Sequence, residues 1–198
     1  MFPIKSMSGR VQGFGGRTLS SYKKTAKYIN SPESEIYFKS KVLYGLYEAK
    51  QSIAKDDCCY IVEGYTDVIQ MHQSGIKNIV SSSGTALSSD QIRLIKRLTS
   101  NIVVLFDSDP AGIRAALRGV DLILEQGINV RVCTFPDGED PDSFAKKNSF
   151  SDLKDFLTNN SKDFIQFKAK LLLKDSENDP VKKATTVRDI IESIAKIP

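Results

Sequence analysis

The chain has 198 residues, of which 40% are hydrophobic and 26% charged, and its formal net charge is +4. This length is enough for one domain with an appendage or for two small domains. No apolar run approaches the roughly 20 residues that a membrane helix needs, and the first residues lack the basic segment and apolar core of a secretory signal. The three cysteines form neither a disulfide framework nor a C-x-x-C zinc spacing, so the expected setting is a reducing cytoplasm without a membrane.

Charge is distributed unevenly along the chain. Residues 1–55 carry 10 Lys/Arg and 3 Asp/Glu (+7), residues 56–150 carry 9 and 13 (−4), and residues 151–198 carry 9 and 8 (+1). A basic leader beside an acidic centre predicts a track for a polyanion that leads to a metal site. The alternative is that the leader is only a solvated basic surface.

The first 31 residues are rich in glycine and polar residues, which predicts short strands and turns and not a complete domain. The abrupt start leads us to expect a preceding part that is missing here. A helix is predicted to begin at Ser31-Pro32-Glu33, because proline suits the first helical position and an acid suits the first turn. Apolar residues at 42, 43, 46 and 49 extend this helix to about Ser52, and Asp56-Asp57 marks the predicted boundary.

From Tyr60 to about Lys147, short apolar runs alternate with amphipathic segments. The predicted strands are 58–62, 79–80, 102–106 and 128–135. The predicted helices lie near 65–73, after the capping box at 88–91, and from Pro110 to Gly127. This alternation is typical of an α/β fold with a parallel sheet flanked by helices. From Ser151 onward the patterns are helical, and Asp179-Pro180 predicts a further helix start.

Five acidic residues follow three of the predicted strands. Glu63 comes after the first strand, Asp107 and Asp109 come after strand 102–106, and Asp140 and Asp142 lie beyond strand 128–135. Because the carboxyl ends of parallel strands meet at one edge of a sheet, these acids are expected to converge on one crevice. Carboxylates held that close repel one another without a cation, and hard divalent cations prefer oxygen ligands. The pattern therefore predicts a divalent-metal site.

Each acidic motif also has an ordinary structural reading. Glu63 suits a helix N-terminus, Asp109 suits an N-cap, and D-P-D is a common turn before a helix. The conjunction of three such motifs after three strands favours the metal site. Two metals there would support nucleotidyl transfer by aligning an attacking hydroxyl and stabilising a leaving pyrophosphate, and the same acids would also suit strand cleavage.

The acidic motifs carry a family resemblance. E-G-Y-x-D at 63–67, D-x-D-x-A-G at 107–112 and D-P-D at 140–142 resemble, in this order, the TOPRIM domain of bacterial primases, type IA and type II topoisomerases and some nucleases. Five further segments are similar to bacterial replicative DNA primases of the DnaG type: GFGGR at 13–17, KYINSPE at 27–33, LYGL at 43–46, SGTAL at 83–87 and FPDGEDPD at 135–142. The resemblance covers about residues 2–148, and the helical tail is less diagnostic.

The resemblance implies the core of an RNA polymerase that makes short RNA primers on a single-stranded DNA template. It implies ribonucleoside triphosphates as substrates and the replicative helicase as a partner. The expected organisation is a partial basic α+β subdomain at 1–55, a TOPRIM catalytic domain at 56–148 and a helical segment at 149–198. The zinc ribbon, the first part of the basic subdomain and the helicase-binding domain of this family have no counterpart here, so the chain is expected to be a fragment, with zinc only in the missing amino-terminal domain.

The resemblance also assigns roles to individual residues. It implies that Glu63 is the catalytic acid/base and a metal ligand, and that the Asp107, Asp109, Asp140 and Asp142 carboxylates bind Mg²⁺ or Mn²⁺. Four basic residues are expected to contact nucleic-acid or nucleotide phosphates: Arg10, Arg17, Lys27 and Lys39. Ser108 stands where the family's middle motif usually has glycine. The alternatives are a topoisomerase or nuclease of the same class and a non-catalytic nucleic-acid-binding module.

Overall fold

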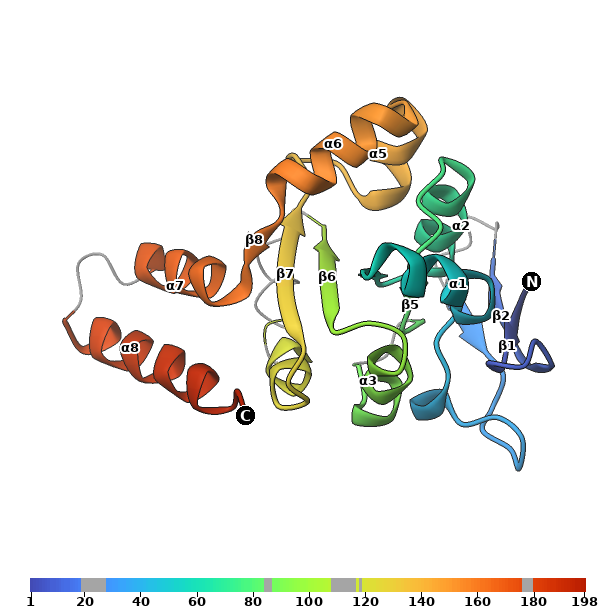
Figure 1. Ribbon diagram of the computed structural model, residues 1–198, viewed down its shortest axis with the longest axis horizontal. Helices are drawn as coiled ribbons and strands as arrows, with labels where there is room; N and C mark the ends of the chain where they lie inside the picture. The colour runs from blue at the N-terminus through green and yellow to red at the C-terminus, as the bar shows by residue number, and fades with distance from the viewer. Residues whose placement is uncertain (19–27, 84–86, 108–116, 118, 176–179) are drawn as a thin grey trace.

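The computed structural model describes residues 1–18, 28–83, 87–107, 117, 119–175 and 180–198, and it contains two β-sheets (Figure 1). The first sheet is antiparallel, in the order β1 (Phe2–Lys5), β2 (Val11–Arg17) and β3 (Tyr28–Asn30). The second sheet has the order β5 (Ile79–Ser81), β4 (Cys59–Val62), β6 (Asn101–Phe106), β7 (Asn129–Thr134) and β8 (Lys162–Asp163). Its first four strands are parallel, and β8 is antiparallel to β7.

Helices cover both faces of the second sheet. The helices that the structure describes are η1 (Lys39–Lys41), α1 (Leu46–Asp56), α2 (Tyr65–Gln73), α3 (Ser89–Lys96), α5 (Pro141–Lys147), α6 (Phe150–Asn160), α7 (Phe164–Asp175) and α8 (Pro180–Ala195), with further helical residues at 119–124. Buried side chains of α1, α3 and 117–124 join one core cluster, and those of α2, α5 and α6 join another. The TOPRIM-like α/β architecture expected from the sequence is confirmed.

The central strand β6 shows how its sequence divides between the two faces. Ile102, Val104 and Phe106 belong to the cluster with α1 and α3, whereas Val103 and Leu105 belong to the cluster with α2 and α6. Side chains alternate along a strand, so an unbroken apolar run is what a strand covered on both faces requires. This strand was predicted at 102–106 for that reason.

Two expectations for the fold are wrong. No helix begins at Ser31-Pro32: the backbone N–H of Ser31 donates to the carbonyl of Phe14 at 2.8 Å, which extends the first sheet, and the helix starts only at Leu46. The preceding Gly45 has φ +82 and therefore interrupts any helix that would run through it. The two-residue edge strand β8 was also not expected, because its residues Lys162 and Asp163 are exposed and polar.

An aromatic seam joins the two sheets. The Tyr65 ring, at the start of α2, stacks on Phe2 with 4.9 Å between ring centroids and meets Tyr44 edge-on at 4.8 Å. The Tyr65 hydroxyl donates to the side-chain oxygen of Asn30 at 2.7 Å. A Cβ atom on Gly15 would lie 2.5 Å from the same ring, so glycine in β2 is what lets the ring approach the sheet. The seam fixes the basic amino-terminal sheet beside the parallel sheet.

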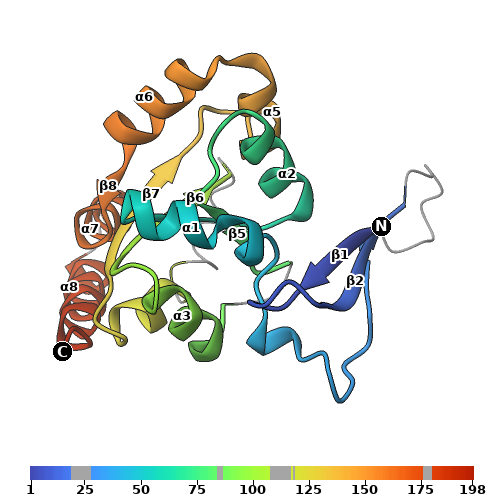
Figure 2. The same cartoon turned by 45° about the vertical axis from the view of Figure 1, so that its right-hand side comes forward.

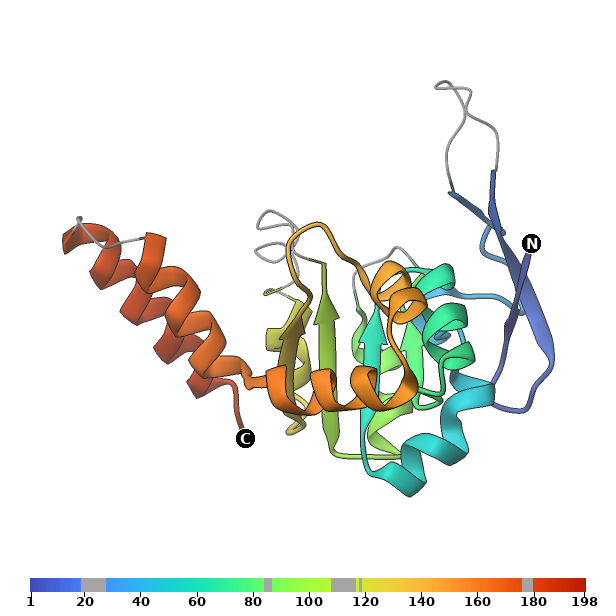
Figure 3. The same cartoon turned by 90° about the horizontal axis from the view of Figure 1, so that it is seen from above.

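The carboxy-terminal helices stand apart from this core. Figures 2 and 3 show α7 and α8 as a helical hairpin on the side of the parallel sheet away from β1 and β2. Within the part of the chain that the structure describes, no helix has the length and apolar character needed to cross a bilayer.

Candidate active site

The order of the parallel strands defines a switch point. From β4 the chain moves to β5 on one side of it and then returns to β6 and β7 on the other side. In open α/β sheets, ligands bind beyond the carboxyl ends of the strands where the strand order reverses. Glu63 follows β4 and Asp107 follows β6, so these two acids flank the switch point.

The predicted acids occupy the carboxyl edge of three neighbouring strands, β4, β6 and β7. Glu63 is exposed, and its backbone carbonyl accepts a hydrogen bond from the buried Ser81 hydroxyl at 3.3 Å, which fixes the turn before α2. Asp107 is exposed directly after β6. Asp109 lies outside the described residues. Asp140 and Asp142 lie at the start of α5, after the turn that follows β7.

Asp67, in the first turn of α2, is affected by the charges of three of these carboxylates. Its side chain is partly buried in the first turn of α2, and one carboxylate oxygen accepts the backbone N–H of Gly64 at 3.0 Å. Burial raises the pKa of Asp67 to about 6, against the opposing effect of the Gly64 hydrogen bond, and the charges of Asp107, Asp140 and Asp142 raise it further. Acids from three separate elements therefore share one electrostatic environment.

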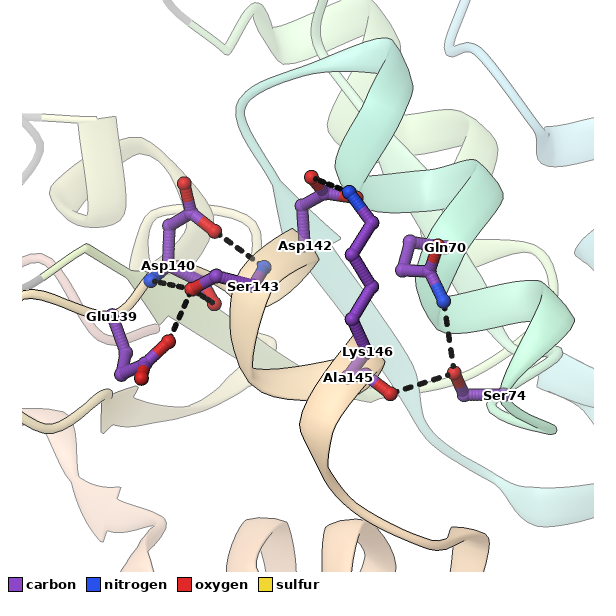
Figure 4. Close-up of polar contacts among 8 residues, drawn as sticks. All are labelled: Gln70, Ser74, Glu139, Asp140, Asp142, Ser143, Ala145 and Lys146. Carbon is purple, nitrogen blue, oxygen red and sulfur yellow. Dashed lines mark hydrogen bonds and ion pairs between the residues drawn. The ribbon is translucent and has the colours of Figure 1, made fainter.

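The start of α5 is an acidic turn in which Ser143 contacts Glu139 and Asp140, and Lys146 contacts Asp142 (Figure 4). Asp140 is the N-cap and accepts the backbone N–H of Ser143 at 2.6 Å. The carboxylate of Asp142 lies 2.6 Å from the Lys146 ammonium. The Lys147 ammonium lies beside Glu139 and lowers the pKa of that carboxyl, as does the hydrogen bond from Ser143. Asp140 thus fulfils the ordinary capping role of a D-P-D turn while its charge still reaches Asp67.

The donor chemistry of this edge fits a hard divalent cation. All its side chains offer carboxylate oxygens, and the repulsion among them is what a bound cation relieves. Within the described ranges, however, no three His, Cys, Asp or Glu side chains lie close enough together to hold a metal ion. On donor chemistry, the described residues that would hold a cation are Asp107 and Asp142, whose charges both act on Asp67.

The predicted basic residues do not form one cluster. Arg10 precedes β2 and Arg17 ends it, so about 23 Å of extended chain separates them. Strand β2 ends on the side toward which the parallel strands point (Figure 3), and the exposed Arg17 guanidinium lies 5.6 Å from the centre of the Tyr28 ring. Lys39 shares a small cavity with Asn30 and Ser83, beyond the end of β5. Arg17 and Lys39 thus lie toward the acidic edge, Arg10 lies away from it, and Lys27 is outside the described residues.

Two residues at this edge were not assigned from the sequence. Asp67 belongs to the E-G-Y-x-D motif, but a first-turn acid of a helix is so common that its position alone gave no functional signal. Lys146 lies four residues after Asp142, a spacing that brings side chains together on a helix and is readable from the sequence once α5 is placed.

Comparisons with known proteins agree with this geometry. Residues 60–145 match a family model described as Toprim-like, and residues 1–50 match one described as the DNA primase catalytic core, N-terminal domain. A DNA primase of Clostridium acetobutylicum is 42% identical over 98% of this chain and 33% of its own length. The chain belongs to the DnaG primase family.

Two solved DnaG-family structures extend the comparison. The DnaG primase catalytic domain bound to ssDNA has a TM-score of 0.86 and 35% identity and covers 100% of this chain and 64% of its own. The Aquifex aeolicus primase, with its zinc binding and RNA polymerase domains, has a TM-score of 0.79 and 33% identity and covers 99% of this chain and 51% of its own. The chain spans about a third of the length of the Clostridium relative.

Proposed function

We propose that this chain carries the catalytic centre for metal-dependent synthesis of short RNA primers on single-stranded DNA. The observation that carries the proposal is that Asp67, Asp107, Asp140 and Asp142 gather at the carboxyl edge of β4, β6 and β7, where the charges of the last three raise the pKa of Asp67. This acidic edge adjoins the amino-terminal segment of charge +7, a suitable surface for a polyanion.

In this proposal the acids hold Mg²⁺ or Mn²⁺. Asp107 and Asp142, with the predicted ligands Asp109 and Asp140, supply oxygen donors, and a cation bound by them would orient a triphosphate and stabilise the charge of the leaving pyrophosphate. Glu63 is exposed beside the switch point, where it serves as acid/base for the attacking hydroxyl or as a further ligand. Zinc belongs to the proposal only outside this chain, because the Aquifex relative has a separate zinc binding domain.

The partners in the proposal are a single-stranded DNA template, ribonucleoside triphosphates and the RNA primer. A DnaG relative has been solved with bound ssDNA. Arg17 and Lys39 lie toward the acidic edge and would contact phosphates, together with Lys27. Arg10 would contact only a nucleic-acid strand that runs along the whole length of β2. We also propose that the protein acts in the cytoplasm at a replication fork, where the replicative helicase delivers it. The proposed domain boundaries lie after residues 55 and 148.

The contacts of Tyr65 exclude it as the nucleophile that a topoisomerase would need. A transesterifying tyrosine must present its hydroxyl to a DNA phosphate, but Tyr65, within the E-G-Y-x-D motif, is 1% exposed and donates its hydroxyl to Asn30. Burial raises the pKa of Tyr65, which further disfavours the phenolate nucleophile. Tyr65 instead joins the two sheets through its contacts with Phe2, Tyr44 and Asn30.

The test is incorporation of ribonucleotides on a single-stranded DNA template, with and without Mg²⁺ or Mn²⁺. We compare the wild type with the Asp107→Asn/Asp109→Asn double variant, and use Asp90→Asn, a partly exposed acid in the first turn of α3, as the matched control. We expect metal-dependent synthesis in the wild type and control, and loss of both synthesis and Mn²⁺ binding in the double variant. Template cleavage would indicate a nuclease, and DNA binding without any metal-dependent chemistry would indicate a binding module.

A further inference from the structure

The acidic turn at α5 contains its own cations. Lys146 and Lys147, in the last turn of α5, pair with Asp142 and Glu139 respectively. The two acids differ in surroundings: Asp142 is among the charges that raise the pKa of Asp67, and Glu139 is not. One lysine therefore neutralises a member of the shared acidic edge, and its neighbour neutralises an acid outside it.

Helix α5 is held firmly in this position. The Ser74 hydroxyl, just after α2, donates to the backbone carbonyl of Ala145 at 3.1 Å, and Gln70 donates to Ser74 at 3.4 Å (Figure 4). Ala145 is buried in the same cluster as Met71 of α2. Because α2 carries Asp67 and α5 carries Asp142 and Lys146, the packing of these two helices fixes where the lysine stands relative to the acidic edge.

The two side chains of the pair differ in how free they are. Lys146 is 56% exposed and Asp142 only 23%, so the ammonium can move into solvent while the carboxylate stays at the edge. The ammonium lies 2.6 Å from one oxygen of Asp142, at hydrogen-bond distance, and so takes up a lone pair that a metal ion would use.

We propose that Lys146 is an internal counter-cation of the metal site, which neutralises Asp142 in the metal-free state and competes with the divalent cation for that carboxylate. This inference rests on the proposed function, because it takes Asp142 as a metal ligand. In this role Lys146 partly neutralises the acidic edge without metal and lowers its affinity for metal. Lys147 has no such role, because its partner Glu139 lies outside the edge.

The experiment is a titration of the 198-residue chain with Mn²⁺ at low ionic strength, followed by the electron paramagnetic resonance signal of free Mn²⁺. We expect Lys146→Met to lower the Kd for Mn²⁺ about two- to threefold, since an exposed i,i+4 ion pair contributes a factor of this size to an equilibrium. Lys147→Met removes the same charge one residue away and should leave the Kd near the wild-type value. Lys146→Arg keeps the cation and should also keep the Kd.

A double-variant cycle makes the assignment specific. In an Asp142→Asn background, Lys146→Met should no longer change the Kd, because the carboxylate for which the two cations compete is absent. A wild-type chain that binds Mn²⁺ with a Kd unchanged by Lys146→Met, or changed equally by Lys147→Met, would overturn the role of Lys146 and leave the metal site intact. Absence of Mn²⁺ binding in every variant would overturn the metal site and the counter-cation together. Circular dichroism confirms that each variant is folded.

Discussion

Two aspartates of this protein, Asp67 and Asp121, are both partly buried and yet are treated in opposite ways. Asp121 lies between the sheet and the carboxy-terminal hairpin, 3.6 Å from the ammonium groups of both Lys168 and Lys196, and accepts the Ser193 hydroxyl at 2.8 Å. Asp67 accepts one backbone N–H and is surrounded by the charges of other acids. Among the described residues, none of the ion pairs includes Asp67.

The comparison separates a structural acid from a functional one. A buried charge that serves only the fold is neutralised by neighbours, as Asp121 is, because an unpaired charge in a protein interior costs free energy. Acids left to repel one another persist where a ligand compensates them. The acids at the carboxyl edge of β4, β6 and β7 repel one another, whereas Asp121, beside the carboxy-terminal hairpin, is neutralised by its neighbours.

The largest effect is expected from Glu63→Gln at the acidic edge, and it should fall on activity and not on stability. Glu63→Gln keeps the size of the side chain but removes its charge and its ability to accept a proton, so primer synthesis should fall by about 100-fold or more. Because Glu63 is exposed, the free energy of unfolding should stay within about 0.5 kcal/mol of the wild type. The measurement is extension of an annealed RNA primer in a full-length protein that carries this chain. Near-normal synthesis by a folded variant would remove Glu63 from the mechanism.

The network of Asp121, Lys168 and Ser193 should affect stability and not activity. Lys168 is 8% exposed, and its ammonium donates to Ser193 at 2.5 Å and faces Asp121. Lys168→Met leaves Asp121 with the more exposed Lys196, so the free energy of unfolding should fall by about 2 kcal/mol. Urea unfolding measures this, with the exposed Lys170→Met on the same helix as the control. Equal midpoints for the two variants would show that the network contributes nothing to stability.

The sequence predicted the strands of the parallel sheet better than the start of the first helix. β6 carries an unbroken apolar run, which a strand covered on both faces requires, and β7 places β-branched Val130 and Val132 at alternate, buried positions. At Ser31-Pro32 the local helix signal was overruled by pairing with β2, a long-range contact that no local pattern reveals. The polar edge strand β8 lacks any strand signal and exists because it pairs with β7.

Sequence reasoning about the site was limited in a similar way. Glu63, Asp107, Asp140 and Asp142 were predictable as residues after strands, because strand ends fix where the chain leaves the sheet. The inclusion of Asp67 depends on how α2 packs against α5, and the pairing of Asp142 depends on where α5 begins. These are properties of helix packing and helix boundaries, which the order of residues along the chain specifies least directly.

The smallest effect is expected for Asp67, where removing a charge should stabilise the fold. With a pKa of about 6 in the folded chain, Asp67 is neutral in both states below about pH 4 and ionised in both above about pH 7. Between these limits the folded state binds more protons, so this residue lowers the free energy of unfolding as the pH rises. Asp67→Asn keeps an acceptor for the Gly64 N–H but cannot ionise, so at pH 8 it should be more stable than the wild type by about 1 kcal/mol, with no gain at pH 4.

The control for this prediction is Asp90→Asn, in the first turn of α3, where the Arg93 guanidinium lies 3.3 Å from the carboxylate. Loss of that charge should be neutral or slightly destabilising, because an acid at a helix N-terminus interacts favourably with the helix dipole. Mn²⁺ should reduce the advantage of Asp67→Asn, since a cation at the edge relieves the same repulsion. If Asp67→Asn is as destabilising as Asp90→Asn at pH 8, the edge is neutralised in the folded chain, and Asp67 belongs with Asp121 among the structural acids.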